Sequence, residues 1–247
     1  MKLFSMTVPA IVLLSLYTGK KPVPPIMMAK PAAPATAPAL AADLQPFVPA
    51  GLSPEAYHMA LKGYQRLKQV GQLRNTHVLT IIDYTLSSLR KRLFVVDMRS
   101  GKVLYNTYVA HGMNSGKEYA RKFSNALQSL ETSLGFYVTM NTYEGKNGLA
   151  LRLRGVERGI NDNATRRGIV LHGADYVSAG YGRQQGFMGR SEGCPAVPKG
   201  QTAPIVRSIR NGSAVFAYYP SAQYLGKSKL LAYNGMESAP PPGRPLP

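Results

Sequence analysis

The chain has 247 residues, 45% of them hydrophobic and 17% charged, so it can bury a core of one or two domains and is not disordered throughout. Thirty Lys and Arg residues against 12 Asp and Glu give a net charge of +18, and such a basic chain favours polyanionic partners: nucleic acid, anionic lipid or acidic envelope polymers. The single cysteine, Cys194, excludes an internal disulfide framework and any metal site built from several thiolates.

The first segment of the chain has the pattern of an export signal. Lys2 precedes an apolar run at residues 3–17, and Lys20-Lys21 ends that run. An apolar run of about 15 residues has the length of a signal peptide and is short for a membrane span. We therefore expect residues 1–21 to be a signal peptide or an uncleaved N-terminal anchor, and the protein to be exported to the periplasm or cell envelope.

Two stretches are too rich in proline to pack into a core. Residues 22–50 are rich in Ala and Pro, which predicts an extended linker. Residues 237–247 contain five prolines and predict a disordered tail. Between these stretches, residues 51–236 are expected to form one folded domain without internal repeats.

The folded part opens with a helical pattern and continues with strands. Ser53-Pro54 reads as an N-cap followed by proline in the first turn, and apolar residues recur behind it at helical spacing. A second helix is expected only at residues 202–209. Short, closely spaced strands with few helices predict a mainly β fold, a β-sandwich or barrel, rather than an alternating βαβ sheet. The expected strands are residues 78–84, 92–97, 103–110, 135–140, 149–153, 168–172 and 214–219, with a hairpin turn at 98–101.

The candidate chemistry lies in His172 and Cys194. His172 ends an apolar strand, and Cys194 lies between Gly193 and Pro195, which predicts a turn. Backbone N–H groups of Gly193 and Cys194 can then face a bound carbonyl oxygen as an oxyanion hole. A nearby imidazole would remove the thiol proton and leave a nucleophilic thiolate. The alternative is an inert thiol and a core histidine, although an unpaired cysteine in a secreted protein is either reactive or a liability.

Two other kinds of site are not supported by the same residues. Residues 189–193 match the G-x-S-x-G pattern of serine hydrolases, but no strand precedes Ser191 and no histidine follows it. His111, His172 and Cys194 lack the short spacing of zinc ligands. We therefore expect neither a metal nor a cofactor.

The sequence around His172 and Cys194 resembles the catalytic signature of the L,D-transpeptidases of peptidoglycan, most closely the murein L,D-transpeptidase catalytic domain branch. The resemblance is carried by Leu171-His172-Gly173 and by the run from Ser191 to Val197. Upstream segments match in the same order, at residues 111–116, 123–125, 133–137 and 143–148. The resemblance covers about residues 77–219 and implies a mixed, mostly β catalytic domain, here residues 51–236.

The resemblance also implies roles for single residues. It makes Cys194 the nucleophile, His172 the base, the carbonyl of Gly173 the group that orients the ring, and Gly193 with Cys194 the oxyanion hole. Basic residues that flank the site either bind stem carboxylates or are solvated loop charges; they are Arg183, Arg190 and Lys199. The residues expected to line the substrate cleft are Ser191, Arg190, Tyr176 and His111.

In the better-known members, His-Gly-Cys is followed by an aliphatic residue and Arg. Here Glu192 replaces that histidine, and Pro195-Ala196 replace the aliphatic–Arg pair. The implied reaction is attack of Cys194 on the carbonyl of the third, diamino residue of a stem peptide, which leaves a thioester. An amine acceptor then gives a 3→3 cross-link, and water gives an L,D-carboxypeptidase.

The sequence leaves the acceptor and the oligomeric state open. Peptidoglycan stem peptides are the expected partners, with acidic envelope polymers as further candidates and no nucleic acid. The alternative function is a non-catalytic, basic, envelope-binding protein.

Overall fold

The computed structural model describes residues 48–146 and 148–232. The predicted export segment at residues 1–21, nearly all of the linker at 22–50 and the tail at 237–247 lie outside the described residues. Among the residues that are described, no helix has the length and apolar character to cross a membrane.

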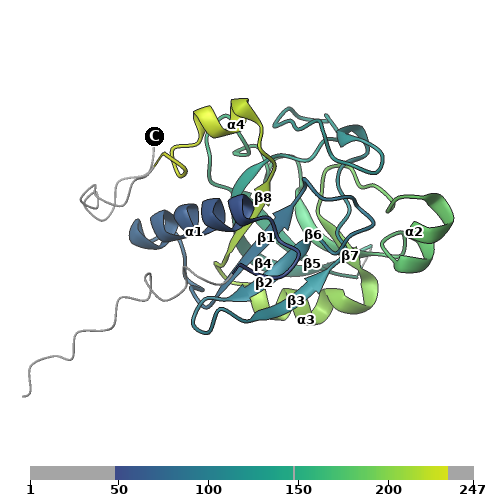
Figure 1. The fold of residues 1–247 in the computed structure, drawn as a ribbon, viewed down its shortest axis with the longest axis horizontal. Coiled ribbons are helices and arrows are strands. Elements are labelled where there is room, and N and C mark those ends of the chain that lie inside the picture. The colour runs from purple at the N-terminus through teal and green to yellow at the C-terminus, as the bar shows by residue number, and fades with distance from the viewer. Residues whose placement is uncertain (1–47, 147, 233–247) are drawn as a thin grey trace, which may run out of the picture. The chain divides into compact units, whose positions relative to one another are not determined.

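Within the described residues, one mixed sheet has the strand order β3-β2-β1-β8-β4-β5-β6-β7 (Figure 1). The pairs β1–β8 and β6–β7 are parallel, and the other neighbours are antiparallel. The strands are β1 (Val78–Asp83), β2 (Leu93–Asp97), β3 (Val103–Thr107), β4 (Gly135–Gly145), β5 (Gly148–Gly155), β6 (Val170–Ala174), β7 (Ala196–Pro198) and β8 (Ala214–Tyr218).

The two edges of this sheet approach each other through the chain that follows β3. The N–H of Ala110 donates to the carbonyl of Ala196 in β7 at 2.8 Å, and the N–H of Ser191 donates to the carbonyl of His111 at 3.0 Å. The N–H of Met113 donates back to Ser191 at 2.7 Å. These bonds bring the sheet close to a closed barrel, so the predicted mainly β, barrel-like fold is confirmed.

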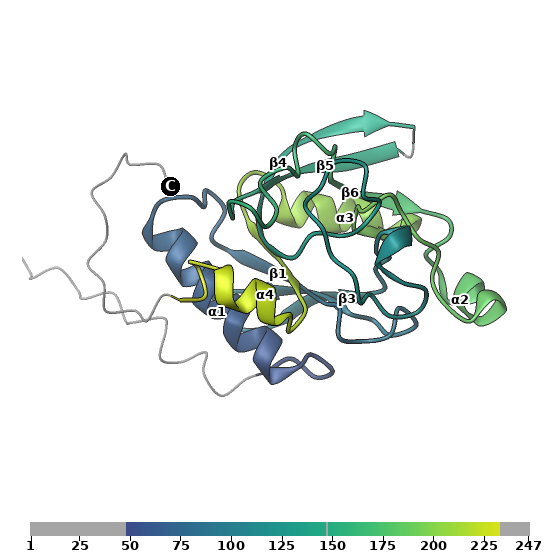
Figure 2. The same ribbon diagram turned by 90° about the horizontal axis from the view of Figure 1, so that it is seen from above.

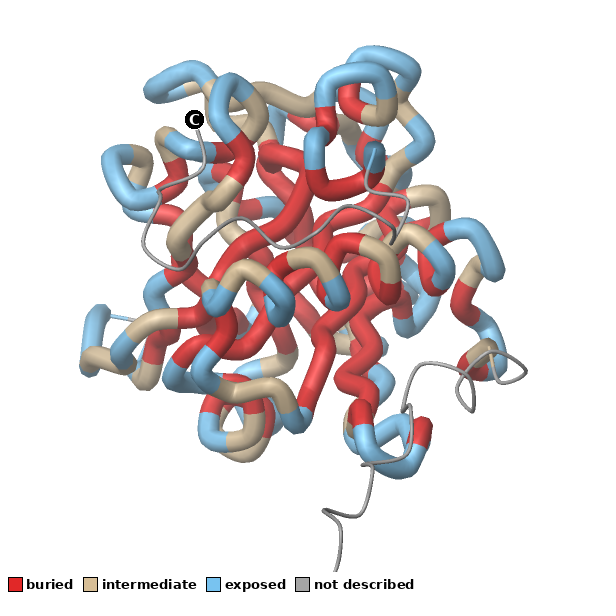
Figure 3. The backbone as a smooth tube through the Cα atoms, turned by 90° about the vertical axis from the view of Figure 1, so that its left-hand side faces the viewer, coloured by how far each residue is buried: buried red, intermediate tan, exposed pale blue. Residues whose placement is uncertain are grey.

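Both faces of the central strands β1 and β8 are buried. In β1, Leu79 and Ile81 belong to one apolar cluster while Val78 and Ile82 belong to another, as the alternation of a strand requires. Helix α1 (Pro54–Gln69) packs on β1 and β8, and helix α3 (Lys199–Ile209) packs on β5, β6 and β7. Figure 2 shows the two helices on opposite sides of β1. Figure 3 shows the buried segments of the backbone in the interior and the exposed segments around them.

Helix α1 begins where the sequence predicts. The Ser53 hydroxyl accepts a hydrogen bond from the N–H of Ala56 at 3.2 Å, which satisfies a donor that the helix leaves unpaired. Gly63 lets the helix approach the sheet, because an added Cβ would lie 2.0 Å from the ring of Phe136. That ring in turn stacks on Phe216 of β8 with 4.1 Å between centroids. The helix is therefore fixed against the sheet by an aromatic pair.

Four short elements were not predicted. They are the 3-10 helix η1 (Met113–Ser115), α2 (Ala179–Gln185), α4 (Ala222–Lys227) and β7, and the expectation of only two helices is therefore wrong. The chain in α2 contains Gly180 and Gly182, which weaken a helical pattern. The Ser178 hydroxyl nevertheless caps this helix by accepting from the N–H of Tyr181 at 3.2 Å.

Candidate active site

His172 and Cys194 line the same cavity, which has a volume of about 410 Å³. His172 lies in β6, and Cys194 lies in the turn that leads into β7. Because these strands are parallel neighbours, His172 stands opposite Ala196, and its N–H lies 3.4 Å from the carbonyl of Pro195. The strand pairing thus brings together two residues that are distant in sequence. The β4–β5 hairpin supplies further wall residues, which are Tyr143, Gly145, Lys146, Gly148 and Ala150.

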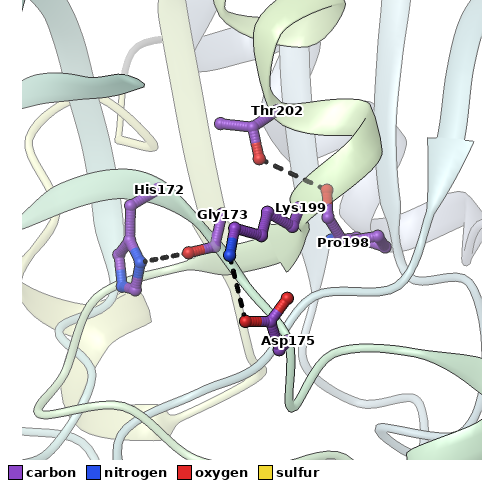
Figure 4. A network of polar contacts seen from close by, with 6 residues as sticks. All are labelled: His172, Gly173, Asp175, Pro198, Lys199 and Thr202. Carbon is purple, nitrogen blue, oxygen red and sulfur yellow. Dashed lines mark hydrogen bonds and ion pairs between the residues drawn. The ribbon is translucent and has the colours of Figure 1, made fainter. Parts of the chain in front are cut away.

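The imidazole of His172 is fixed by the next residue in the chain. Its Nδ1 lies 3.0 Å from the carbonyl oxygen of Gly173 (Figure 4). A carbonyl oxygen can only accept, so Nδ1 carries the hydrogen and, in the neutral ring, Nε2 keeps a free lone pair. His172 is 8% exposed, so the ring is packed on most sides. This tautomer is suited to accept a proton at Nε2.

Gly173 allows the first turn of α3 to pack on the backbone next to His172. A Cβ at this position would lie 2.4 Å from Oγ1 of Thr202 and 3.1 Å from the Cα of Lys199. The same turn is held by the Thr202 hydroxyl, which donates to Pro198, and by an ion pair between Lys199 and Asp175 at 3.1 Å (Figure 4). Lys199 is therefore paired at the surface and is not part of the cavity wall.

The thiol of Cys194 is held by the chain that enters β6. The N–H of Val170 donates to Sγ at 3.5 Å, and the S–H donates to the carbonyl of Gly168 at 3.8 Å. Within the described part of the chain, no hydrogen bond joins Sγ to the imidazole. Burial raises the pKa of the thiol, the Val170 N–H and the charge of Arg167 lower it, and the charge of Glu192 raises it. The resting group is a neutral thiol that needs a base.

The hydroxyl of Ser191 stabilises the turn before Cys194 through two hydrogen bonds. The N–H of Gly193 donates to Oγ of Ser191 at 3.1 Å, and this hydroxyl donates to the carbonyl of Cys194 at 2.6 Å. The N–H of Gly193 is thus engaged within the turn in this conformation, and its part in an oxyanion hole stays a prediction. The N–H of Cys194 has no acceptor within residues 48–146 and 148–232 and is the remaining candidate donor. Ser191 lines the cavity, but its hydroxyl bonds stay within the turn.

Two of the residues expected in the substrate cleft line the cavity with partners of their own. Tyr176 packs against the backbone of Gly189, and burial raises the pKa of its phenol to about 12. The Arg190 guanidinium donates to the carbonyls of Met113 at 3.0 Å and Gly116 at 3.3 Å. Of the other basic candidates, Arg183 does not contribute to the cavity wall.

His111 does not line the cavity, which corrects the sequence-based expectation. It is 1% exposed, its Nδ1 accepts from Nη2 of Arg92 at 2.7 Å, and its Nε2–H donates to the carbonyl of Gly116 at 3.3 Å. Burial, together with the charge of Arg92, lowers the pKa of His111 to about 3. The neutral ring therefore connects Arg92 in the core to Gly116 in the loop beside the cavity through two hydrogen bonds.

Two buried or half-buried arginines were not singled out in the sequence. Arg92 is fully buried, where it donates to the carbonyls of Val109 and Leu86. Arg167 immediately precedes the segment that holds the thiol, and burial lowers the pKa of its guanidinium. The only signal in the sequence was the place of Arg167, just before the strand that carries His172.

Comparison with known proteins relates this fold and site to a family. Among solved structures, an L,D-transpeptidase from Xylanimonas cellulosilytica is 14% identical with a TM-score of 0.36, over 57% of this chain and 60% of that one. An L,D-transpeptidase from Mycobacterium smegmatis is 15% identical with a TM-score of 0.38, over 58% and 59%. The helical cell shape determining protein Pgp2 from Campylobacter jejuni is 11% identical with a TM-score of 0.37, over 64% and 57%.

The chain thus spans about three fifths of these solved chains. No curated protein matches it. The sequence model of the L,D-transpeptidase catalytic domain matches residues 49–218, which is more than half of the chain and includes both His172 and Cys194. The chain therefore belongs to the L,D-transpeptidase catalytic domain family.

Proposed function

We propose that this protein is an exported, cysteine-dependent L,D-transpeptidase of peptidoglycan, or the hydrolytic L,D-carboxypeptidase version of that enzyme. The observation that carries the proposal is the shared cavity of His172 and Cys194, in a chain whose residues 49–218 match the family. Stem peptides of peptidoglycan are the proposed substrates. Neither a metal nor a cofactor is needed for the steps below.

The first step is activation of the thiol. Cys194 rotates its Sγ away from the carbonyl of Gly168 and transfers its proton to Nε2 of His172. The carbonyl of Gly173 holds the Nδ1–H and stabilises the imidazolium that forms, in the way that an acceptor orients the base of a catalytic triad. Only the neutral imidazole has a lone pair at Nε2 to accept this proton. Because burial raises the pKa of the thiol, the thiol needs such a base to ionise.

The second step is formation of the acyl-enzyme. The thiolate attacks the carbonyl carbon of the third, diamino residue, and the N–H of Cys194 donates to the oxygen that becomes negative. The bond to the terminal D-residue breaks, His172 returns the proton to the leaving amine, and a thioester remains. An amine of a second stem then gives a 3→3 cross-link, whereas water gives a trimmed tripeptide.

The remaining cavity residues have two proposed roles: some position the nucleophile, and others contact the substrate. Ser191 keeps the turn before Cys194 in place through its two hydrogen bonds. Arg190 and Tyr176 stand at the wall, where a guanidinium and a phenol can contact stem carboxylates and peptide groups. Glu192 adds a negative charge beside the sulfur, where the better-known members have a histidine.

The test is product analysis with a defined tetrapeptide muropeptide, with and without an amine acceptor, followed by mass spectrometry. The Cys194→Ala variant is expected to lose more than about 10³-fold in rate, since removal of a nucleophile leaves only residual catalysis. Arg166→Met is a matched control, because Arg166 is exposed and outside the cavity. Wild-type turnover by Cys194→Ala would reject the proposal. A dimer with acceptor indicates the transferase, and a tripeptide alone indicates the carboxypeptidase.

A further inference from the structure

We propose that Arg167 is a positioning residue for Cys194, whose guanidinium braces the nucleophile turn and favours the thiolate over the thiol. The proposal deepens the proposed function and rests on it. Arg167 lies in the loop that precedes β6, three residues before the strand that carries His172.

The first observation is that the chain from Arg167 to Val170 holds the sulfur. The carbonyl of Gly168, the residue after Arg167, accepts the S–H at 3.8 Å. The N–H of Val170 donates to Sγ at 3.5 Å. An N–H donor stabilises a thiolate, and a carbonyl acceptor stabilises a thiol. This segment can therefore form a hydrogen bond with Cys194 in either protonation state.

The second observation is that the guanidinium lies against the backbone of the nucleophile turn. A Cβ added to Gly193 would lie 3.0 Å from Nη2 of Arg167 and 2.8 Å from the carbonyl oxygen of Glu131. Gly193 also has φ +119°, which side chains rarely adopt. The residue directly before Cys194 is thus packed on Arg167 and on the carbonyl that Arg167 binds.

The third observation is that the guanidinium is fixed by neutral acceptors. Nη1 donates to the carbonyl of Ser124 at 2.7 Å, and Nη2 donates to the hydroxyl of Ser129 at 3.1 Å. The carbonyl of Glu131 and the hydroxyl of Ser133 complete the set. Among the described residues, no carboxylate lies within ion-pair distance of the guanidinium, and the charge of Glu131 acts on it only from farther away. Its charge therefore acts on the half-buried sulfur.

Other groups around the sulfur do not replace this charge. The pKa values of Tyr84 and Tyr176 are raised to about 12 by burial, so both phenols are neutral near pH 7. Glu192 opposes the thiolate. The titratable and charged groups around Cys194 and Arg167 are Tyr84, Glu131, Tyr137, His172, Tyr176 and Glu192, with Lys146 and Arg190 at the cavity wall.

The experiment measures the rate of alkylation by iodoacetamide as a function of pH, in the full chain. Cys194 is the only cysteine, so the rate reports on this thiol alone. For Arg167→Met, we expect the profile to shift to higher pH and the rate at pH 7 to fall about tenfold, as when an opposite charge near an acid is removed. Arg167→Lys keeps the charge but loses part of the guanidinium's hydrogen bonds, so its profile should shift less than that of Arg167→Met.

Arg166→Met is the matched control, since it removes the neighbouring, exposed positive charge. Its profile should stay within about twofold of the wild type. Thermal unfolding of each variant shows whether it folds, and Arg167→Gln serves as a second neutral variant if Arg167→Met does not. Unshifted profiles for the folded neutral variants, or equal shifts for Arg167→Lys and Arg167→Met, would overturn the proposal and leave Arg167 a structural brace. Alkylation needs no peptidoglycan, so this result is separate from a failure of the proposed function.

Discussion

Arg92 and Arg167 are two cations whose hydrogen bonds all go to uncharged acceptors. Arg92 is fully buried, with its donors on backbone carbonyls and on the ring of His111. Such partners satisfy the donors without cancelling the charge. The consequence for His111 is a ring that cannot take up a proton near neutral pH, because burial and the charge of Arg92 both lower its pKa.

The first prediction concerns His111 and the pH dependence of stability. In the unfolded chain a histidine has a pKa of about 6.5, whereas that of folded His111 is about 3. Between these values the unfolded state binds more protons, so the free energy of unfolding falls as the pH decreases through this window. The loss from this residue is at most about 1.4 kcal/mol per pH unit. Above about pH 6.5 it contributes no slope.

Urea unfolding of the wild type and of His111→Gln between about pH 4 and 7 tests this expectation. A glutamine amide can accept from Arg92 and donate to Gly116 but cannot titrate, so the variant should lose the slope that His111 causes. His58, which is exposed, provides the control substitution His58→Gln. If His111→Gln kept the wild-type slope, the ring would not be the group responsible.

His172 and Cys194 could be singled out from the sequence because each has a local pattern around it. A glycine follows the histidine, and Gly193 and Pro195 flank the cysteine. Arg92 and Arg167 could not be singled out, because arginine is rarely buried and its acceptors come from distant loops. The place expected of His111 could not be predicted for a similar reason, because its ring is enclosed partly by Arg92, which is distant in the sequence.

Helices and strands likewise divide into those with a local sequence pattern, which could be predicted, and those without one, which could not. Helix α1 was predictable from its N-cap and periodic apolar face, and β1 and β8 from their β-branched and aromatic residues. Helices α2 and α4 have 7 and 6 residues, too few for a periodic pattern, and β7 has 3. The pairing of β6 with β7 fixes the position of the cysteine turn relative to the histidine, because it sets the register between His172 and Ala196.

The second prediction concerns the contact between β6 and α3. In Gly173→Ala, the new Cβ would meet Oγ1 of Thr202 and the Cα of Lys199, and the backbone atom cannot move without shifting the helix. We expect a loss of about 1–3 kcal/mol in the free energy of unfolding, as for other overpacked sites. Activity should fall as well, because the Gly173 carbonyl orients the base. Addition of Thr202→Ala should restore part of the stability.

Gly200→Ala is the matched control for this contact. Gly200 also lies in the first turn of α3, and an added Cβ would meet nothing within 4 Å. Alanine in a helix should therefore be neutral or stabilise by up to about 1 kcal/mol. Urea denaturation compares the three variants with the wild type. Equal stabilities for Gly173→Ala and Gly200→Ala would contradict the tight packing of β6 on α3.

At the scale of the whole molecule, the net charge of +18 determines which polymers the protein attracts. Residues 1–50 carry four lysines and one aspartate, so most of the excess belongs to the rest of the chain. A surface of this kind concentrates an acidic polymer around the protein without a specific pocket. For an L,D-transpeptidase, such attraction would hold the cavity near its polymeric substrate, and in the non-catalytic alternative it would be the entire function.

The last prediction separates this attraction from recognition by the cavity. We use Cys194→Ala, which we expect to lack turnover. The fraction of this variant that sediments with an acidic wall polymer should fall at least about tenfold between about 0.05 M and about 0.5 M NaCl, since salt screens exposed charges. The same polymer with its carboxylates amidated is the control and should retain little protein at either salt concentration. Binding that depends neither on salt nor on amidation would show that the +18 charge does not hold the protein to the polymer. Recognition by the cavity around His172 would then be the explanation for binding.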